Sequence, residues 1–501
     1  MKKIDILRKK YPKFVYKKYS YQISDKNLEI FFDFQIYGLQ PSHHPPASGP
    51  LDSTSIIFEP KVVIENVKES QIKRVGKRVL DNLVFNLGLI EILSYWKATC
   101  SPEIIVNAGY LNLEQIKWWK DLIINGMGQF FYENKIDFTK PNFIKIIPIN
   151  VAGAHNNYVA GARDRVLVPV GGGKDSVVTL EILKRAGKKI SCFSLNPTEA
   201  AQEIMRIGGF ADSIIVKRKI DPKLLELNRR GFLNGHTPFS AYLAFLSVLC
   251  AVIFDYKFIA FSNERSSNEG NLKYLGKIIN HQWSKSFEFE KKFRKYCRKY
   301  LTPGVKEDKS SFPPSLPLRG SSVVEYFSFL RPLYEIQIAK LFSKYPQYFN
   351  AFLSCNEAYK TYSGTKKITK KWCGNCPKCL FVFASLYPFI EKGDLIKIFG
   401  QNLFEKKELL SMMLELISLK KFKPFECVGT KKESLVTFCL SWKKYRDRVS
   451  VKLPFLLKYF EKKIMPKYQN LEVDSRKIMK SWNNQNNLPR NFEKILRRCI
   501  L

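Results

Sequence analysis

The feature that most constrains the fold is an alternation of short apolar runs with helical segments that begins at Arg165. The successive segments are RVLVPV, SVVTLEILKRAG, KISCFSL, TEAAQEIMRIGG and SIIVKRKI. The apolar runs have the length of strands, and the segments between them have the apolar spacing of helices. Such alternation predicts a parallel sheet with helices on both faces and ligands beyond the carboxyl ends of its strands. We therefore expect an α/β fold.

The turn after the first of these strands is suited to approach a phosphate group. It consists of Gly171, Gly172, Gly173, Lys174, Asp175 and Ser176. Three consecutive glycines let the backbone come close to an anion, and the start of the following helix favours negative charge. Lys174 adds a cation, Ser176 a hydroxyl, and Asp175 a ligand for a magnesium ion shared with the phosphates. We interpret the turn as a nucleotide site; the alternative is an ordinary glycine-rich connection.

The spacing of this turn differs from the Walker pattern, which requires Gly-x-x-x-x-Gly-Lys-Ser/Thr. Here Asp175 separates Lys174 from Ser176, and the glycines are contiguous. The turn instead resembles the PP-loop of the ATP pyrophosphatases, Ser-Gly-Gly-x-Asp-Ser, with Gly171 in place of the first Ser. In those enzymes ATP is split to AMP and pyrophosphate while a substrate oxygen is adenylylated. The resemblance implies ATP and Mg²⁺ as cofactors, with Lys174 and Asp175 in catalytic roles.

A second group of chemically active residues is a cluster of cysteines. Cys373, Cys376 and Cys379 form two Cys-x-x-Cys steps, and Cys355 lies a short distance upstream. Four thiolates suit tetrahedral zinc, whereas three in this spacing also suit an iron–sulfur cluster. A similar cysteine group follows the nucleotide domain of the deazaguanine nitrile synthases, and this resemblance favours structural Zn²⁺. An iron–sulfur cluster and the absence of any metal are the open alternatives.

Two polar stretches follow apolar runs and are candidates for the edge of the nucleotide site. The stretch at residues 234–238 contains His236, and the stretch at residues 262–271 follows the strand-like run KFIAF. The second is unusually rich in hydrogen-bonding side chains for a simple connection. His281 and Arg331 lie in further polar segments, Arg331 as a candidate anion contact. His236 and His281 are the candidate general bases, although a single histidine is more often a structural residue.

The length of 501 residues exceeds what one hydrophobic core usually organises, so we expect several regions. Apolar runs at residues 30–32 and 55–58 predict strands, and the spacing at residues 81–98 predicts a helix. The expected regions are a mixed N-terminal domain at 1–160, the PP-loop ATP-binding domain at 161–345, a cysteine module at 346–395 and a helical C-terminal region at 396–501.

The sequence favours a cytoplasmic protein with no membrane span. Its longest apolar run, at residues 241–254, is shorter than the roughly 20 residues that a membrane-spanning helix needs, and we expect it to form a buried helix. The basic N-terminus lacks the apolar stretch of a secretory signal. Eleven cysteines with one tight cluster indicate metal ligation and buried thiols rather than a disulfide framework.

The formal net charge of +38 does not by itself identify a partner. Lysine is spread through every region, so we interpret the charge as a solvated basic surface. The alternative is attraction of polyanionic partners, which include nucleotide-linked substrates and RNA. Nucleic acid therefore remains a secondary candidate partner.

Several stretches together resemble the UDP-N-acetylmuramoyl-L-alanyl-L-glutamate epimerase family, MurL. They are LIEILSYWKATCSPEIIV, VPVGGGKDS, FSNERSSNEGN, NHQWSKSFEFE, FLRPLYEIQIAKLFS and WCGNCPKCLFVF, and they cover about residues 80–395. The resemblance implies inversion of the terminal L-glutamate of a UDP-muramoyl dipeptide to D-glutamate in peptidoglycan precursor synthesis. It also implies that ATP is consumed to AMP and pyrophosphate with Mg²⁺ present. Adenylylation suits this chemistry because it removes the carboxylate charge and leaves a carbonyl that accepts electrons.

The resemblance also implies roles for residues in these stretches. The turn at 171–176 would bind the phosphates, and Asp175 would bind the magnesium ion. The proton carriers stay open among His236, Glu264, Glu269 and His281. The predicted substrate contacts are Asn263, Arg265, Asn268, Asn271 and Arg331.

Two other functions stay open on the sequence. A PP-loop enzyme that modifies tRNA would use the basic charge, and a thiolating version would need a reactive cysteine near the loop. Cys192 and the group at residues 373–379 are the candidates for that cysteine. The third interpretation is a non-catalytic nucleotide-binding regulator, and the intact Lys174, Asp175 and Ser176 argue against it. The sequence does not indicate an oligomeric state.

Overall fold

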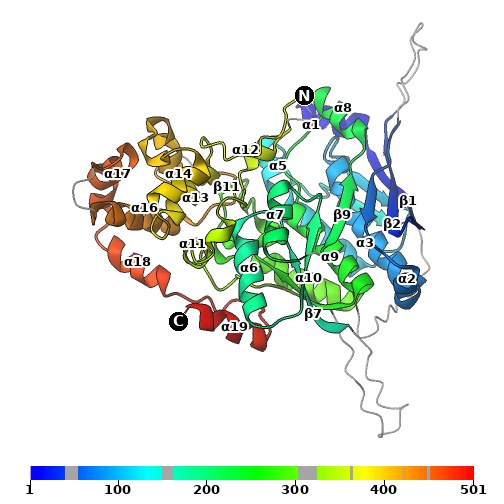
Figure 1. The fold of residues 1–501 in the computed structure, drawn as a ribbon. Coiled ribbons are helices and arrows are strands. Elements are labelled where there is room, and N and C mark those ends of the chain that lie inside the picture. Colours follow the sequence, from blue (N-terminus) through cyan, green and yellow to red (C-terminus); the bar gives the residue numbers. More distant parts are fainter. Residues whose placement is uncertain are drawn as a thin grey trace.

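One large mixed β-sheet organises the protein, with helices packed around it and the C-terminal helices gathered at one side (Figure 1). The computed structural model describes residues 2–39, 55–148, 162–210, 212–302, 324–361, 365–420, 422–447 and 452–500. Within these residues the strand order is β13-β10-β7-β8-β9-β4-β2-β1-β5-β6, and β3 pairs with β2. The expected α/β class is confirmed.

One half of the sheet is parallel and has the order of a doubly wound fold. Its strands are β7 (Arg163–Pro169), β8 (Ile190–Leu195), β9 (Ile214–Lys219), β10 (Tyr256–Phe261) and β13 (Glu325–Ser328). The first of these five strands along the chain, β7, lies in the middle, with β8 and β9 on one side and β10 and β13 on the other. Helices α6 (Lys174–Arg185) and α7 (Glu199–Ile207) follow β7 and β8, as the alternation predicted. The strand order reverses between β7 and β10, which is where such sheets bind ligands.

The N-terminal strands extend the same sheet. They are β1 (Lys13–Ser24), β2 (Asn27–Tyr37), β3 (Ser55–Phe58), β4 (Lys61–Ile64), β5 (Glu103–Val106) and β6 (Lys145–Pro148). The strands predicted at residues 30–32 and 55–58 are β2 and β3. Strand β4 pairs antiparallel with β9, so the sheet continues from the region before residue 160 into the region after it. The first two regions expected from the sequence therefore share one sheet.

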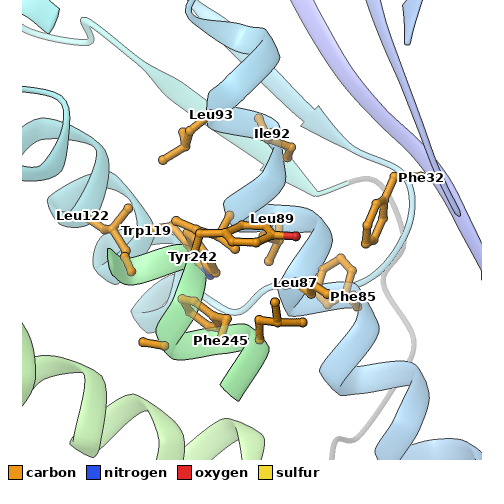
Figure 2. Close-up of a cluster of buried hydrophobic side chains, with 14 of the residues drawn as sticks. Phe32, Phe85, Leu87, Leu89, Ile92, Leu93, Trp119, Leu122, Tyr242 and Phe245 are labelled. Atoms are coloured by element: carbon orange, nitrogen blue, oxygen red, sulfur yellow. The ribbon is translucent and has the colours of Figure 1, made fainter. Parts of the chain in front are cut away.

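Two apolar helices and their neighbours form a large core beside the sheet. Helix α3 (Lys77–Trp96) contacts α9 (Phe239–Phe254), and Trp119 of α4 (Leu113–Gly126) stacks on Phe245 of α9. Figure 2 shows Tyr242 and Phe245 of α9 among buried side chains of α3 and α4. Helix α3 is long and apolar enough to cross a membrane, but most of that stretch is buried inside the protein. The buried helix expected at residues 241–254 is α9.

The remaining elements lie before and after the cysteine cluster in the chain. Those before the cysteine cluster are α1 (Lys3–Lys10), α2 (Glu69–Val75), α5 (Gly128–Glu133), α8 (Pro222–Arg229), the hairpin β11 (Leu272–Tyr274) and β12 (Lys277–Ile279), α10 (Phe287–Tyr296) and α11 (Glu335–Phe342). Those after it begin with α12 (Asn356–Tyr359), α13 (Pro377–Leu386), α14 (Lys392–Phe399) and α15 (Leu410–Leu416), and continue with α16 (Lys431–Arg446), α17 (Phe455–Tyr459), α18 (Leu471–Met479) and α19 (Arg490–Ile500). The expected helical C-terminal region is confirmed.

The last helix returns to the parallel sheet. Phe492 of α19 lies with its ring centroid 4.9 Å from that of Phe258 on β10 and 4.8 Å from that of Phe327 on β13. Aromatic pairs at this separation bury large apolar surfaces. The C-terminal region is therefore packed against the same strands that position the cavity described below.

A buried ion pair connects helix α3 of the N-terminal region with strand β9. Arg218 donates to both carboxylate oxygens of Glu91, with Nε to Oε2 at 2.8 Å and Nη2 to Oε1 at 2.7 Å. The Glu91 side chain is fully buried, and 13% of the Arg218 side chain is exposed. Removing one partner of such a pair leaves an uncompensated buried charge, at a cost of about 3–5 kcal/mol.

We therefore expect Glu91→Ala to lower the thermal unfolding midpoint by several degrees. The matched control is Glu226→Ala, because Glu226 pairs with Arg230 on the surface, where both side chains are more than half exposed. An exposed pair contributes only about 0–1 kcal/mol. Differential scanning calorimetry of both variants checks this expectation, and equal midpoints for the two variants would contradict it.

Candidate active site

A cavity of about 340 Å³ lies at the carboxyl ends of β7 and β10. The turn after β7 contributes Asp175 and Ser176 to its wall, and the segment after β10 contributes Asn263 and Glu264. Segments far along the chain close it with Lys378 and other polar groups. Because β7 and β10 are adjacent strands at which the strand order reverses, the topology of the sheet brings these segments together.

The glycine turn needs glycine for both conformation and space. Gly172 has a φ of +93°, and a Cβ there would lie 3.0 Å from the Cβ of Ala200. Its carbonyl oxygen accepts a hydrogen bond of 2.8 Å from the backbone amide of Leu353. Gly173 is the residue before α6 and provides no side chain to cap the first amides of that helix. The start of α6 therefore faces the cavity as a site for an anion.

Three carboxylates meet beside this turn. Asp175, Glu264 and Glu335 place carboxylate oxygens within 4.8 Å of one another. Asp175 lies in the first turn of α6, Glu264 follows β10, and Glu335 is the first residue of α11. Glu264 is 4% exposed and Glu335 2% exposed. Oxygen ligands of this kind suit a hard divalent cation, so this group could hold a magnesium ion.

Buried lysines offset part of this negative charge. The Nζ of Lys174 lies 2.5 Å from Oδ1 of Asp175 and also donates to Glu335. The Nζ of Lys378 lies 3.7 Å from Oε1 of Glu335. Burial alone would raise the pKa of Glu335, but Lys174 and then Lys378 lower it to about 2. Burial, followed by the charge of Glu335, raises the pKa of Glu264 to about 7.

A second polar group at the cavity centres on Cys427. The Nζ of Lys285 donates to its Sγ at 3.2 Å, and Nε2 of His281 lies 3.8 Å from the same sulfur. The ammonium group of Lys378 donates to the carbonyl oxygen of Cys427. Burial opposes ionisation of the thiol, but Lys285 and then His281 lower the pKa of Cys427 to about 5. A thiol with this pKa is mostly thiolate at neutral pH.

The four cysteines predicted to bind metal do converge. Cys355, Cys373, Cys376 and Cys379 place their sulfurs within 4.8 Å of one another. The Sγ–Sγ distances are 3.9 Å for Cys355 and Cys376, 3.6 Å for Cys373 and Cys379, and 3.5 Å for Cys376 and Cys379. Zinc–sulfur bonds of about 2.3 Å in a tetrahedron require sulfurs roughly 3.8 Å apart. The cluster could therefore bind a metal such as zinc.

The cysteine cluster also positions one wall of the cavity. Ser354 and Asn356 flank Cys355 in the chain, Lys378 precedes Cys379, and all three line the cavity. The backbone amide of Cys379 donates to the sulfur of Cys376, a type of contact that orients thiolate ligands. A metal held here would fix the position of the Lys378 ammonium beside the carboxylates.

Two family domains match the chain. The MurL N-terminal domain matches residues 7–306, and the MurL C-terminal domain matches residues 351–463. The chain belongs to the MurL family. The first domain supplies the glycine turn, Glu264 and Lys285, and the second supplies the cysteine cluster and Cys427. The cavity therefore lies between the two MurL domains.

Curated relatives of the chain carry the name UDP-N-acetyl-alpha-D-muramoyl-L-alanyl-L-glutamate epimerase. The protein from Micromonospora sp. is 32% identical over 427 residues, which cover 84% of this chain and 85% of the relative. The Xanthomonas oryzae pv. oryzae protein is 30% identical over 78% of this chain and 81% of its own length. The Salinispora tropica protein is 31% identical over 85% of this chain and 84% of its own length. No solved structure matches the chain.

The structure brings part of the predicted site to the cavity. The predicted residues that line it are Gly171, Gly173, Asp175, Ser176, Asn263 and Glu264. Lys174 lies behind the wall, with its ammonium directed at Asp175 and Glu335. His281 reaches the site through its contact with Cys427. The ring of His236 lies 4.7 Å from that of His281, and burial lowers the pKa of His236 to about 3, so it is neutral at pH 7.

Five other predicted residues stabilise loops around the cavity and do not line it in the described part of the chain. Arg331 is fully buried and donates to the carbonyl oxygens of residues 264 and 285. Asn268 accepts from the first amide of α10, and Glu269 accepts from the first amide of α16. Asn271 makes hydrogen bonds to three backbone groups, and Arg265 lies over the ring of Tyr334. Proton transfer by Glu269 and substrate contacts by the other four residues stay predictions.

Glu335, Lys378 and Cys427 line the cavity but received no role from the sequence. Glu335 and Lys378 lie in stretches that resemble the MurL family, each in the first turn of a helix, and that position is the signal that could have identified them. Cys427 lies in the C-terminal region, where no motif marks it. Its role depends on Lys285 and His281, which are more than 140 residues away in the chain.

We expect the purified protein to contain tightly bound zinc, and Cys376→Ser to lose it because three thiolates no longer close a tetrahedral site. Inductively coupled plasma mass spectrometry measures the metal. Cys439→Ser, which removes a buried thiol outside the cluster, is the control and retains the zinc. Iron with acid-labile sulfide, or wild-type protein without metal, would contradict this assignment.

Alkylation of Cys427 by iodoacetamide is expected to have a pH midpoint of about 5 in the wild type, because the thiolate is the nucleophile. Lys285→Met removes a positive charge that stabilises the thiolate, so the midpoint rises towards about 8.5. Peptide mass spectrometry after timed alkylation gives the midpoint. Lys292→Met, which removes a lysine paired with Asp121 and Glu288 on the surface, leaves it unchanged. A wild-type midpoint of an ordinary thiol would contradict the expected ionisation.

Proposed function

We propose that this chain inverts the terminal L-glutamate of UDP-N-acetylmuramoyl-L-alanyl-L-glutamate to D-glutamate through a carboxyl adenylate, with ATP converted to AMP and pyrophosphate. An epimerase acting on a UDP-muramoyl dipeptide follows from membership of the MurL family and from relatives that share this name over about four fifths of the chain. The ATP-dependent step rests on one observation: the glycine turn opens into the same cavity as the three carboxylates.

The phosphates of ATP would bind at the turn of residues 171–176. The glycine backbone permits close approach, and the start of α6 favours negative charge. The carboxylates of Asp175, Glu264 and Glu335 would hold Mg²⁺, which neutralises phosphate charge when bound. The oxygen-only donor set and the mutual distance of these groups fit this cation. Lys174 keeps two of the carboxylates in place.

The chemistry explains why a nucleotide site is useful to an epimerase. Removing the α-proton of a glutamate whose carboxylate is not activated would place a second negative charge beside that carboxylate. A carboxylate oxygen that attacks the α-phosphorus of ATP expels pyrophosphate and forms an acyl adenylate. The carboxylate charge is then gone, and the carbonyl can accept the electron pair when the α-proton leaves. A proton returned to the opposite face inverts the carbon, and hydrolysis releases AMP.

Two ammonium groups would hold the acidic substrates in this cavity. Lys285 and Lys378 both line it, next to the carboxylates and Cys427. A cation beside the glutamate carboxylate would orient one oxygen towards ATP. Arrangement of the reacting atoms is a large part of catalysis in phosphoryl and nucleotidyl transfer. The cysteine cluster would contribute by fixing Lys378.

A cytoplasmic location accords with this function. All eleven cysteines lie in the described part of the chain and none forms a disulfide there, which accords with a reducing compartment. The substrates are nucleotide-linked precursors and ATP. The net charge of +38 would then favour anionic substrates in general.

A PP-loop enzyme that modifies tRNA is the second candidate, and one observation favours it. A thiolating enzyme needs a reactive cysteine at the nucleotide site, and Cys427 lines the cavity. Cys192, the candidate from the sequence, is instead buried on β8, where burial raises its pKa to about 12. A non-catalytic regulator would bind ATP without turnover. The experiment below separates all three.

We expect pyrophosphate release from ATP and Mg²⁺ in the presence of UDP-N-acetylmuramoyl-L-alanyl-L-glutamate, together with D-glutamate after acid hydrolysis. A coupled pyrophosphate assay measures the first and chiral chromatography the second. Bulk tRNA is the parallel acceptor. Release with tRNA alone would establish the modifying enzyme, and binding of ATP without release would establish the regulator.

We expect Asp175→Ala to abolish the reaction, because it removes a ligand of the proposed magnesium ion and a partner of Lys174. Pyrophosphate release should fall below detection while the melting profile stays close to that of the wild type. Asp212→Ala, outside the cavity, should retain full release. Turnover retained by Asp175→Ala would remove the nucleotide assignment.

A further inference from the structure

The thiol of Cys427 faces the cavity in which the glutamate would be activated. It lines the same space as Ser176, Glu264 and Glu335. Its sulfur accepts a hydrogen bond from Lys285 and contacts Nε2 of His281. An ionised sulfur in this position could reach a substrate bound between the nucleotide and the C-terminal domain.

Hydrogen bonds fix the form of His281. The amide Nε2 of Gln129 donates to the carboxylate of Glu133 at 2.7 Å, so the Gln129 oxygen is the atom that faces His281. That oxygen lies 2.7 Å from Nδ1 of His281, which must therefore carry a hydrogen. Nε2, the atom that faces Cys427, then donates to the thiolate when the ring is protonated and accepts the thiol proton when the ring is neutral. His281 is arranged to take a proton from the thiol.

An independent sign of a ligand is the side chain of Gln282. Gln282 is 4% exposed and lines the cavity. Its side-chain oxygen has no hydrogen-bond partner among the described residues. A buried polar atom without a partner is costly, so such atoms in native proteins usually meet a ligand or water. The wall beside His281 is therefore prepared for a polar group of the substrate.

The other cysteines do not share these features. Four form the cysteine cluster. The remaining six, Cys100, Cys192, Cys250, Cys297, Cys439 and Cys499, have pKa values raised first by burial. Cys427 differs because charged groups face it from several elements. They are Lys285 and His281 before α10, Lys378 of α13, and Glu426, which directly precedes Cys427.

We propose that Cys427 is a catalytic residue whose thiolate removes the α-proton of the activated glutamate, with His281 as the relay that restores the thiolate. This inference rests on the proposed function. The S–H bond forms as the Cα–H bond breaks, and the electron pair enters the carbonyl of the acyl adenylate. The thiol proton then passes to Nε2 of His281. His281 releases this proton to water, and a proton from water reaches the opposite face of the carbon, which completes the inversion.

The test follows the two halves of the reaction separately in the full-length protein. Wild type, Cys427→Ala and Cys427→Ser are given ATP, Mg²⁺ and the dipeptide substrate in D₂O. Pyrophosphate release reports adenylylation, and loss of the α-proton signal in the ¹H-NMR spectrum reports proton removal. General acid–base catalysis contributes about 10²–10⁴-fold. We expect both variants to lose α-proton exchange by that factor and to keep pyrophosphate release within several-fold.

Two controls address folding and the loss of a thiol as such. Cys499→Ser removes a thiol on α19 that is not part of the cavity lining, and it should exchange at the wild-type rate. Zinc content and melting midpoint show whether the Cys427 variants fold. His281→Asn should also slow exchange, because it removes the proton acceptor while leaving Cys427 in place.

Each other outcome has a defined meaning. Exchange at the wild-type rate in Cys427→Ala overturns the inference, and so does loss of pyrophosphate release together with exchange, which would assign Cys427 to adenylylation or binding. A peptidyl thioester on Cys427, detected by mass spectrometry after acid quench, would make it a nucleophile instead. If the wild type exchanges without releasing pyrophosphate, the proposed ATP step fails, while loss of exchange in the variants still supports Cys427.

Discussion

The buried ammonium of Lys174 is the interaction on which the site depends. Three carboxylates within 4.8 Å of one another, two of them almost fully buried, would repel one another strongly in a medium of low polarity. Lys174 lies between Asp175 and Glu335 and holds the pKa of Glu335 at about 2, whereas burial and the charge of Glu335 raise the pKa of Asp175. Glu264, which lacks a direct ion pair among the described residues, has its pKa raised to about 7. The repulsion between these three carboxylates also favours binding of a cation among them.

The second organising principle is the meeting of two domains. The sheet places a glycine turn, a helix start and the switch in strand order at one point, an arrangement that suits an anion. The C-terminal domain adds cations and a thiol that the sheet lacks. Lys378 is fixed by the cysteine cluster on one side and contacts both Glu335 and Cys427 on the other. The proposed nucleotide site and the proposed proton-transfer residue therefore share one cavity.

The acid–base properties of the cavity follow from which charges are neighbours. Glu335 is held ionised by lysines, whereas Cys427 is held ionised by Lys285 and His281 despite its burial. The neutral His236 lies beside His281 and contributes little charge. An enzyme that removes a weakly acidic α-proton needs an ionised base beside an electron-accepting carbonyl. In the proposed function, the thiolate of Cys427 is that base, and adenylylation by ATP bound at the glycine turn creates that carbonyl.

The sequence by itself determined the local elements and the family. Alternating apolar runs specified β7, α6, β8, α7 and β9, and three contiguous glycines specified a turn that opens into the cavity. The spacing of the cysteines predicted a cluster that the structure confirms, because all but one of its members lie within seven residues. Tertiary structure decided the rest. It joined the N-terminal strands to the parallel sheet through β4 and β9, and it turned Arg331 inward as a loop support. It also brought Glu335, Lys378 and Cys427 to the cavity. Their roles depend on charged partners that are distant in the chain, so no local sequence pattern could identify these residues before the fold placed them beside those partners.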